Sequence, residues 1–331
     1  MRKNIARPIK KLKKYNMQKK IAKFSLKLLV TVGFLAWIIF KVEWAETWVY
    51  VQKVQIWQIA LYLFLVLLGM VVSSYKWQVL AKFKNINRPF FDYFKFYLTG
   101  TFVNNFMPSF VGGDTYRAYQ LGRTEKKYAE AASTVVIDRI TGLVAATILA
   151  LVFSLLNFKV VLENNLLIFM NLAIVCSLIF DLILMRVKKI SFLQKLAVRF
   201  LPEKIIHFFR ELEAYSHNHG VLWRAIALGG VFTFFGMALS NFVLMYALGV
   251  QISFRDYLSV IFLITIVSSI PITINNIGLK EWAYVTFFGL FGVNSSLIII
   301  VAILGRFLQM ALSFSALPMY LKTKKEIPKE L

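Results

Sequence analysis

Cysteine and histidine are rare in this 331-residue chain, which contains one cysteine and three histidines. Cys176 alone excludes an intrachain disulfide and a metal cluster held by several cysteines. His207, His217 and His219 share one polar segment without a matching set of acidic or cysteine ligands, which favours solvated side chains over a metal site. The nucleotide-binding motif Gly-x-x-x-x-Gly-Lys-Ser/Thr is also absent. The sequence therefore predicts neither a cofactor nor a bound metal.

Charged residues are scarce as well, at 17% of the chain, whereas 59% of the residues are hydrophobic and the mean hydropathy is +0.66. Because a soluble domain carries about 25% charged residues, this composition predicts a polytopic membrane protein of the all-α class. Membrane-spanning helices are expected near 21–40, 57–80, 131–156, 165–186, 223–248 and 296–320. An even number of spans leaves both termini on the same side of the membrane.

Acidic residues are missing from the first 27 positions, which carry a dense series of lysines and arginines. Such a cluster beside a membrane span predicts an orienting signal and a patch that binds anionic lipid headgroups. Because no folded basic domain accompanies it, nucleic acid is not an expected partner. The chain is expected to divide into a basic arm over 1–20, a single transmembrane domain over 21–321 and a short basic tail over 322–331.

Positive charge distinguishes the two sides of the predicted bundle. Lysine and arginine are abundant after the second, fourth and sixth predicted spans and sparse in the other connections. By the positive-inside rule, both termini face the cytoplasm. Segment 187–222 alternates aromatic, apolar and basic residues, which is typical of an amphipathic helix on the cytoplasmic surface. Segment 41–56, with Trp44 and Trp48, predicts an amphipathic stretch at the opposite interface.

Two further apolar segments, 90–122 and 257–292, are each interrupted by proline, glycine and amide residues that charged residues follow. Backbone that leaves a helix at membrane depth needs protein or water to satisfy its polar groups, so such breaks tend to line a cavity. A single crossing by either segment would move the later basic connections to the wrong side. Both are therefore predicted to be re-entrant hairpins, 90–122 from the cytoplasm and 257–292 from outside. Hairpins from opposite faces indicate an inverted-topology repeat with a substrate site where the breaks meet.

The first break places Gly112, Gly113 and Asp114 before a returning helix that carries Arg117. The two glycines allow a tight turn. Asp114 suits the cap of the following helix, and its spacing from Arg117 allows an ion pair on one helical face. In the alternative interpretation, the free amides of the glycine turn and Arg117 together hold a phosphate group. The two interpretations are compatible.

The second break runs from Pro271 through Asn275, Asn276 and Gly278 to Glu281. The proline ends one half-helix, and the asparagines and the glycine make the turn. Glu281 either caps the returning half-helix or serves as a titratable group that faces the cavity. The cost of a charge at that depth favours a functional role.

Charged residues also fall inside the predicted spans. Arg306 lies near the middle of the sixth, where an unpaired guanidinium costs at least about 2.5 kcal/mol. It requires an anionic ligand or an acidic partner. The candidate partners are Asp114, Asp138 and Glu281. Asp138 and Arg139 enter the third span, whereas Lys280 is expected to extend to the interface.

The motifs Asn105-x-x-Pro108, Gly112-Gly113-Asp114-x-x-Arg117, Asp138-Arg139-x-x-Gly142 and Pro271 through Gly278-x-x-Glu281 follow one another along the chain. This set resembles the transmembrane region of lysylphosphatidylglycerol synthases and the wider family of flippase-like membrane proteins, over nearly the whole chain. The resemblance implies lipid translocation in a bacterial cytoplasmic membrane. It also implies no enzymatic activity, because the soluble aminoacyltransferase domain of the synthases is missing. Asn275 and Asn276 stand where the family has a more glycine-rich turn.

A polar cavity with a cationic arginine would lower the cost of moving a phosphate-bearing headgroup through the membrane. The leading expectation is a flippase of an anionic phospholipid or a polyprenyl-phosphate-linked lipid, passive or ion-coupled, with Asp138 or Glu281 as proton carrier. One alternative is a membrane glycosyltransferase that uses a lipid-linked donor, with Glu43 or Glu46 as its base. The other is a non-transporting accessory subunit of envelope biosynthesis. The residues expected to bind lipid are Asn105, Pro108, Gly112, Gly113, Asp114, Arg117, Asp138, Arg139, Asn275, Asn276, Gly278, Glu281 and Arg306.

Overall fold

The computed structural model describes residues 25, 28–107, 112–186 and 202–325. These residues form helices and connections without a strand, which confirms the all-α class for this part of the chain. The basic arm and Pro108 lie outside the described residues. So do positions 187–201 of the amphipathic segment and 326–331 of the tail.

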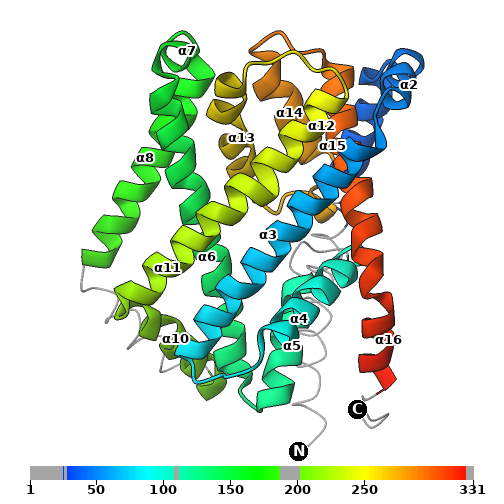
Figure 1. Ribbon diagram of the computed structural model, residues 1–331. Helices are drawn as coiled ribbons and strands as arrows, with labels where there is room; N and C mark the ends of the chain where they lie inside the picture. Colours follow the sequence, from blue (N-terminus) through cyan, green and yellow to red (C-terminus); the bar gives the residue numbers. More distant parts are fainter. Residues whose placement is uncertain (1–24, 26–27, 108–111, 187–201, 326–331) are drawn as a thin grey trace, which may run out of the picture.

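The first half of the described chain contains two long helices with a broken pair between them (Figure 1). After an apolar helix over Leu28–Lys41, the helices are α2 (Trp44–Gln52), α3 (Ile56–Phe83), α4 (Phe90–Asn104), α5 (Gly112–Glu125) and α6 (Tyr128–Leu156). A capping box starts α3, because the Gln55 N–H donates to the Gln58 side chain at 2.9 Å. Pro89 directly precedes α4, where its missing N–H costs the helix no hydrogen bond.

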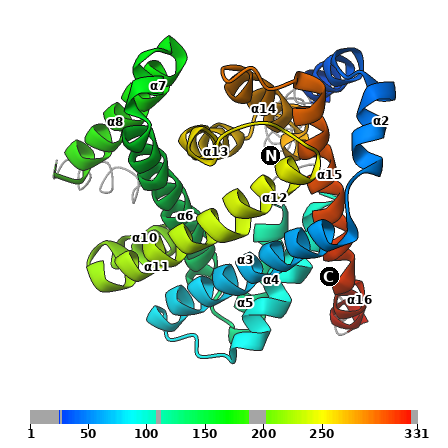
Figure 2. The ribbon, with the colours of Figure 1, turned by 45° about the horizontal axis from the view of Figure 1, so that its top comes forward.

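The second half contains a long helix with a widened π-helical turn, a second broken pair and a final long helix. Its helices are α7 (Phe158–Leu162), α8 (Asn165–Arg186), α10 (Glu203–Ser216), α11 (His219–Val231), η1 (Phe232–Leu239), α12 (Ser240–Ala247), α13 (Phe254–Ser268), η2 (Ile274–Asn276), α14 (Leu279–Gly289), α15 (Ser295–Ser313), η3 (Phe314–Ala316) and α16 (Leu317–Lys325). η1 is the π-helical turn that connects α11 to α12. α8 contacts α6 and stands at the outer edge of the bundle (Figure 2).

Within the described part of the chain, four helices are long and apolar enough to cross a membrane, which supports a multi-pass membrane protein. They are Ile56–Phe83, Tyr128–Leu156, His219–Ala247 and Ser295–Lys322. These correspond to the second, third, fifth and sixth predicted spans. The first and fourth predicted spans contain the shorter apolar helices Leu28–Lys41 and Asn165–Cys176. The count of six spans therefore stays a prediction.

The two interrupted segments form pairs of half-length helices, α4 with α5 and α13 with α14. Figure 1 shows the first pair in the lower half of the molecule and the second in the upper half. The first pair meets at two glycines, because a Cβ added to Gly100 would lie 2.9 Å from the Gly113 carbonyl oxygen. The expected tight turn at Gly112 and Gly113 is wrong, since both residues are already helical in α5. Gly113 is instead required by the close approach of two helix backbones.

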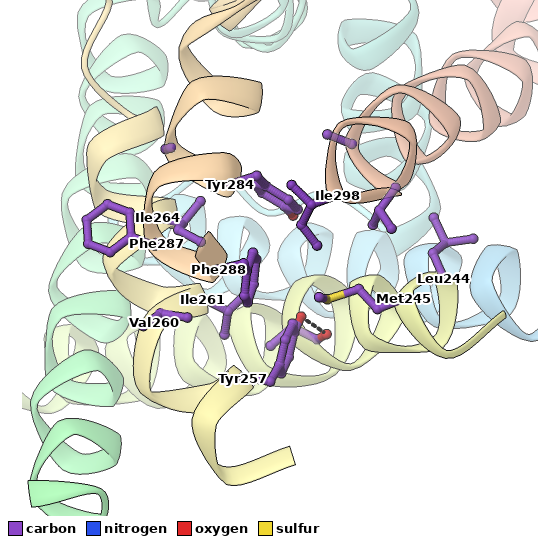
Figure 3. Packing of buried hydrophobic residues seen from close by; sticks show 14 of the residues in the cluster. Leu244, Met245, Tyr257, Val260, Ile261, Ile264, Tyr284, Phe287, Phe288 and Ile298 are labelled. Carbon is purple, nitrogen blue, oxygen red and sulfur yellow. Dashed lines mark hydrogen bonds between the residues drawn. The ribbon is translucent and has the colours of Figure 1, made fainter. Parts of the chain in front are cut away.

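Aromatic side chains hold the second broken pair against its neighbours (Figure 3). The rings of Tyr257 from α13 and Phe288 from α14 stack with centroids 5.7 Å apart. The buried Tyr257 hydroxyl donates to the Ala238 carbonyl oxygen at 2.6 Å, so its polar end is satisfied by the π-helical turn. Met245 and Ile298 complete this part of the core from α12 and α15. The core thus fixes α13 and α14 between two membrane-crossing helices.

The described part of the amphipathic segment contains helix α10, which packs on α6. Its Tyr215 hydroxyl donates to the Leu80 carbonyl oxygen at 2.8 Å, and its Glu211 pairs with Lys84 at 2.8 Å. The His207 side chain is 49% exposed and lies 3.6 Å from carboxylate oxygens of Glu211 and Glu130. Helix α10 is therefore attached to the C-terminal end of α3 and to α6.

Candidate functional site

The two breaks in the apolar sequence meet at Asn104, the last residue of α4. Its side-chain amide donates to Asn275 Oδ1 at 3.2 Å, and its side-chain oxygen accepts the Gly113 N–H at 3.3 Å. One side chain thus joins the end of α4, the start of α5 and the second break. Arg306 of α15 reaches the same place and donates to the Asn275 carbonyl oxygen at 3.0 Å. Segments that are far apart in the sequence therefore form one site.

A cluster of ion pairs occupies the α5 and α6 side of this site. Arg117 Nε donates to Asp114 Oδ1 at 3.0 Å, and its Nη2 donates to Asp138 Oδ2 at 2.7 Å. Arg139 donates to both oxygens of Asp114, at 2.7 and 3.0 Å. Lys76 of α3 lies 2.9 Å from Asp138 Oδ1. Each of the two carboxylates therefore contacts two cations.

Arg117 is deeply buried in this cluster, with 3% of its side chain exposed. Its guanidinium also lies 4.9 Å from the Trp77 ring and 5.1 Å from the Tyr97 ring. Ion pairs and aromatic faces together offset the loss of hydration. The expected pair between Asp114 and Arg117 is present, and Asp114 also lies in the first turn of α5, where a negative charge is favourable.

A second cluster surrounds Arg306 on the other side of the site. Arg306 Nη2 donates to Glu281 Oε1 at 2.9 Å, so Glu281 is the partner among the three expected candidates. The other Glu281 oxygen accepts the Gly278 N–H at 2.7 Å and caps α14. The interpretation of Glu281 as a cap is therefore confirmed, and its other oxygen is paired with Arg306.

The turn of the second break uses left-handed backbone. The φ angles are 49° at Asn275, 57° at Asn276 and 84° at Gly278. Asparagine and glycine tolerate this region better than other residues. The turn directs the carbonyl oxygens of both asparagines to Arg306, at 3.0 and 3.3 Å. The asparagines therefore adopt the left-handed backbone at positions where the resemblance leads one to expect glycine.

A cavity of about 650 Å³ lies between the two clusters. Its charged lining residues are Lys76, Asp114, Asp138, Arg139, Lys280 and Arg306. Apolar residues of α6 and α13, such as Leu143 and Ile261, line it as well. A smaller pocket of about 120 Å³ shares Asp114 and Arg139 with this cavity and is also lined by Arg117. The site thus combines a charged centre with apolar walls.

Residues 24–315 match the family described as the lysylphosphatidylglycerol synthase TM region. The chain belongs to this family. The match includes both broken helix pairs and every charged residue of the two clusters, so the resemblance inferred from the motifs is confirmed. A search of curated proteins returned no match to the chain.

In this member of the lysylphosphatidylglycerol synthase TM family, most of the predicted lipid-binding residues gather at the cavity. Those that line it are Asn105, Asp114, Asp138, Arg139, Asn275, Asn276 and Arg306. Gly113 and Arg117 line the smaller pocket. Glu281 accepts a hydrogen bond from Arg306 and another from the Gly278 N–H, so these two residues position Arg306 without lining the cavity. Gly112 begins α5. Pro108 lies outside the described residues. Their contact with a lipid stays a prediction.

Three polar residues of the site were not predicted. Lys76 is a charge inside an otherwise apolar span, and this signal was sufficient to identify it. Asn104 is the amide that begins the first break. Lys280 was expected at the interface, which is wrong: it lines the cavity, and its Nζ lies 5.3 Å from the Tyr284 ring. Because α14 begins at Leu279, Lys280 sits at the depth of the break itself.

Amide side chains in the apolar spans join helices around the cavity, as expected for such residues in a membrane. The Tyr284 hydroxyl donates to Asn241 Oδ1 at 3.0 Å and links α14 to α12. Gln309 Nε2 donates to the Tyr62 hydroxyl at 2.9 Å and links α15 to α3. Both bonds connect elements of the cavity wall.

Proposed function

We propose that this protein is a flippase that moves an anionic phospholipid or a polyprenyl-phosphate-linked lipid across the bacterial cytoplasmic membrane. The observation that carries the proposal is the cavity between the two breaks, which collects charged side chains from α3, α5, α6, α14 and α15. A headgroup that crosses the hydrocarbon core loses its hydration, and preformed charges at mid-depth replace part of it.

The edge of the cavity suits the apolar part of a lipid. Ile140 and Leu143 of α6 line the cavity, and each is more than 40% exposed. A lipid whose headgroup enters between the clusters could therefore leave its chains against these residues and in the bilayer. This arrangement favours a lipid substrate over a small soluble anion.

We further propose that α4 with α5 and α13 with α14 are re-entrant hairpins that enter from opposite membrane faces, as in an inverted repeat. Their positions in opposite halves of the molecule and the bond between Asn104 and Asn275 support this arrangement. Both termini then face the cytoplasm, and the basic arm binds anionic headgroups there.

We propose no catalytic step for this site. Asp114, Asp138 and Glu281 are all held by cations, so none of them is available as a free base. Glu43, considered above for a glycosyltransferase, is not among the residues that line the cavity. Transport is passive or ion-coupled, and in the second case Asp138 or Glu281 would carry the proton after its ion pair opens.

Reconstituted vesicles test the proposal directly. The purified protein is incorporated into vesicles that contain phosphatidylglycerol or a polyprenyl phosphate with a fluorophore on the apolar chain, and a membrane-impermeant reductant bleaches the outer leaflet. We expect the wild-type protein to deliver inner-leaflet lipid to the reductant. A proton gradient in either direction then separates passive from proton-coupled movement.

Two substitutions on one helix provide the matched comparison. Leu143→Trp on α6 narrows the cavity, whereas Leu155→Trp on the same helix replaces a side chain that is 70% exposed and does not line it. We expect the first to slow translocation by about tenfold or more, equivalent to about 1.4 kcal/mol, and the second to leave it unchanged. Equal rates with wild-type protein and with protein-free vesicles for every anionic lipid would refute the flippase.

A further inference from the structure

The charges that line the cavity do not balance. Among the described residues, four cationic side chains and two carboxylates line it, which leaves two positive charges in excess. Arg117 pairs with the lining residue Asp114, and Glu281 pairs with the lining residue Arg306. These two side chains add one charge of each sign, so the excess of two positive charges is unchanged. A site of this charge at mid-depth is costly to leave without an anion.

Lys280 accounts for one of these charges most clearly. Lys76, Arg117, Arg139 and Arg306 all pair with carboxylates. Within the described residues Lys280 forms neither an ion pair nor a side-chain hydrogen bond, and its Nζ lies 5.3 Å from the Tyr284 ring. It also lies in the first turn of α14, where the free N–H groups and the helix dipole favour an anion.

Phosphate chemistry distinguishes two classes of lipid headgroup. A phosphomonoester carries a second ionisation near pH 6 and therefore approaches two negative charges at pH 7. A phosphodiester such as that of phosphatidylglycerol carries one. Two excess positive charges match the first class, and the three donors of a lysine ammonium suit its additional terminal oxygen.

We infer that the cavity selects a dianionic phosphomonoester headgroup and that Lys280 binds the second negative charge of its phosphate. The inference rests on the proposed function in taking the cavity as the path of the lipid. The headgroup phosphate lies between Lys280, Arg306 and Arg139, with its apolar chain toward Leu143 and Ile140. Both a glycerolipid phosphomonoester and a polyprenyl monophosphate carry this headgroup.

Binding measured in detergent, without translocation, tests the inference. The full chain is titrated with phosphatidic acid and with phosphatidylglycerol of the same acyl chains, and binding is followed by native mass spectrometry. A polyprenyl monophosphate and inorganic phosphate are titrated in parallel. We expect the wild-type protein to bind phosphatidic acid about tenfold more tightly than phosphatidylglycerol. Lys280→Gln should weaken the affinity for phosphatidic acid by about tenfold to a hundredfold and the affinity for phosphatidylglycerol by less.

Two variants separate the role of this charge from a general loss of structure or of positive charge. Lys280→Arg retains the charge and should keep the preference for the phosphomonoester, whereas Lys82→Gln removes an exposed lysine outside the cavity and should change neither affinity. Melting temperatures of all variants in the same detergent show that each is folded.

The outcomes are distinct. Equal affinity of the wild-type protein for the two glycerolipids, or a preference that survives Lys280→Gln, would overturn the inference. Inorganic phosphate that binds as tightly as either lipid would overturn the lipid part of it. A preference for phosphatidic acid or for polyprenyl monophosphate that Lys280→Gln removes supports it, and the tighter of the two identifies the lipid class. If that preference is present but no lipid moves in vesicles, the inference stands and the flippase fails.

Discussion

The contact between Glu281 and Arg306 joins a carboxylate that is 2% exposed to a guanidinium that is 31% exposed. Removal of the arginine would leave a buried negative charge without a counter-charge, at a cost of about 3 kcal/mol. We therefore expect Arg306→Gln to lower the free energy of unfolding in detergent by about this amount. Glu281→Gln should cost less, because glutamine keeps an acceptor for the Gly278 N–H.

The double variant Glu281→Gln with Arg306→Gln completes a thermodynamic cycle. Because it removes both charges together, we expect it to be more stable than Arg306→Gln alone, with a coupling energy of about 1 kcal/mol or more. Arg88→Gln, which breaks more exposed pairs with Asp92 and Glu125, serves as the control and should cost under about 1 kcal/mol. Strictly additive losses at positions 281 and 306 would show that the two charges are not coupled.

At this scale the sequence predicted which charges lie in apolar segments and one of their pairs, Asp114 with Arg117, but not the remaining pairs. Arg306, Asp114 and Asp138 were identifiable because a charge in an apolar segment is costly and must have a partner. The choice of Glu281 for Arg306 depends on where the turn at Asn275 places the returning helix relative to α15, which a single sequence does not define. Lys280 was expected at the interface because the sequence did not show that α14 begins at Leu279, directly after the break.

Helix packing around the cavity depends on small residues at particular contacts. A Cβ added to Gly236 in the π-helical turn would lie 2.7 Å from the Cα of Gly69 in α3, whereas a Cβ on Gly230, in the same long helix, would meet nothing within 4 Å. We expect Gly236→Ala to lower the free energy of unfolding by about 1–3 kcal/mol through overpacking. Gly230→Ala should be neutral or raise it by up to about 1 kcal/mol, because alanine favours a helix.

Thermal unfolding of both variants in one detergent checks this pair. A loss of stability with Gly230→Ala equal to that with Gly236→Ala would mean that the contact of α3 with the π-helical turn is not what limits the packing. Phe232 and Met237 of the same turn line the cavity. The Gly236→Ala variant should therefore also slow lipid translocation in vesicles, whereas Gly230→Ala should not.

Elements were predictable where composition changes along the chain and were missed where packing decides. Apolar runs predicted the long helices within a few residues, and Pro271 with the glycines and asparagines predicted the two breaks. The π-helical turn between α11 and α12 was not predicted, because no local motif marks it and its close contact with α3, at Gly236 and Gly69, involves residues far apart in the sequence. For the same reason Gly113 was assigned to a turn, although it serves a helix contact with Gly100.

The whole molecule presents two broken helix pairs in opposite halves, joined at Asn104 and Asn275 (Figure 1). If both pairs are re-entrant, the residues that flank each pair lie on one side of the membrane. The positive-inside rule then assigns the flanks of α4 and α5 to the cytoplasm and those of α13 and α14 to the outside. A single crossing by either pair would place its flanks on opposite sides, so accessibility of the flanks decides between the two topologies.

Single cysteines in a Cys176→Ser background measure this accessibility, because Cys176 is the one native thiol. Asn87→Cys precedes the first pair, and Thr124→Cys lies in its last helical turn, at the end of α5. Gln251→Cys and Val293→Cys flank the second pair. In intact cells we expect a membrane-impermeant maleimide to label the second two and to label the first two only after the membrane is permeabilised. Labelling of one member of either pair from the opposite side would show that this pair crosses the membrane, and the inverted repeat would then be wrong.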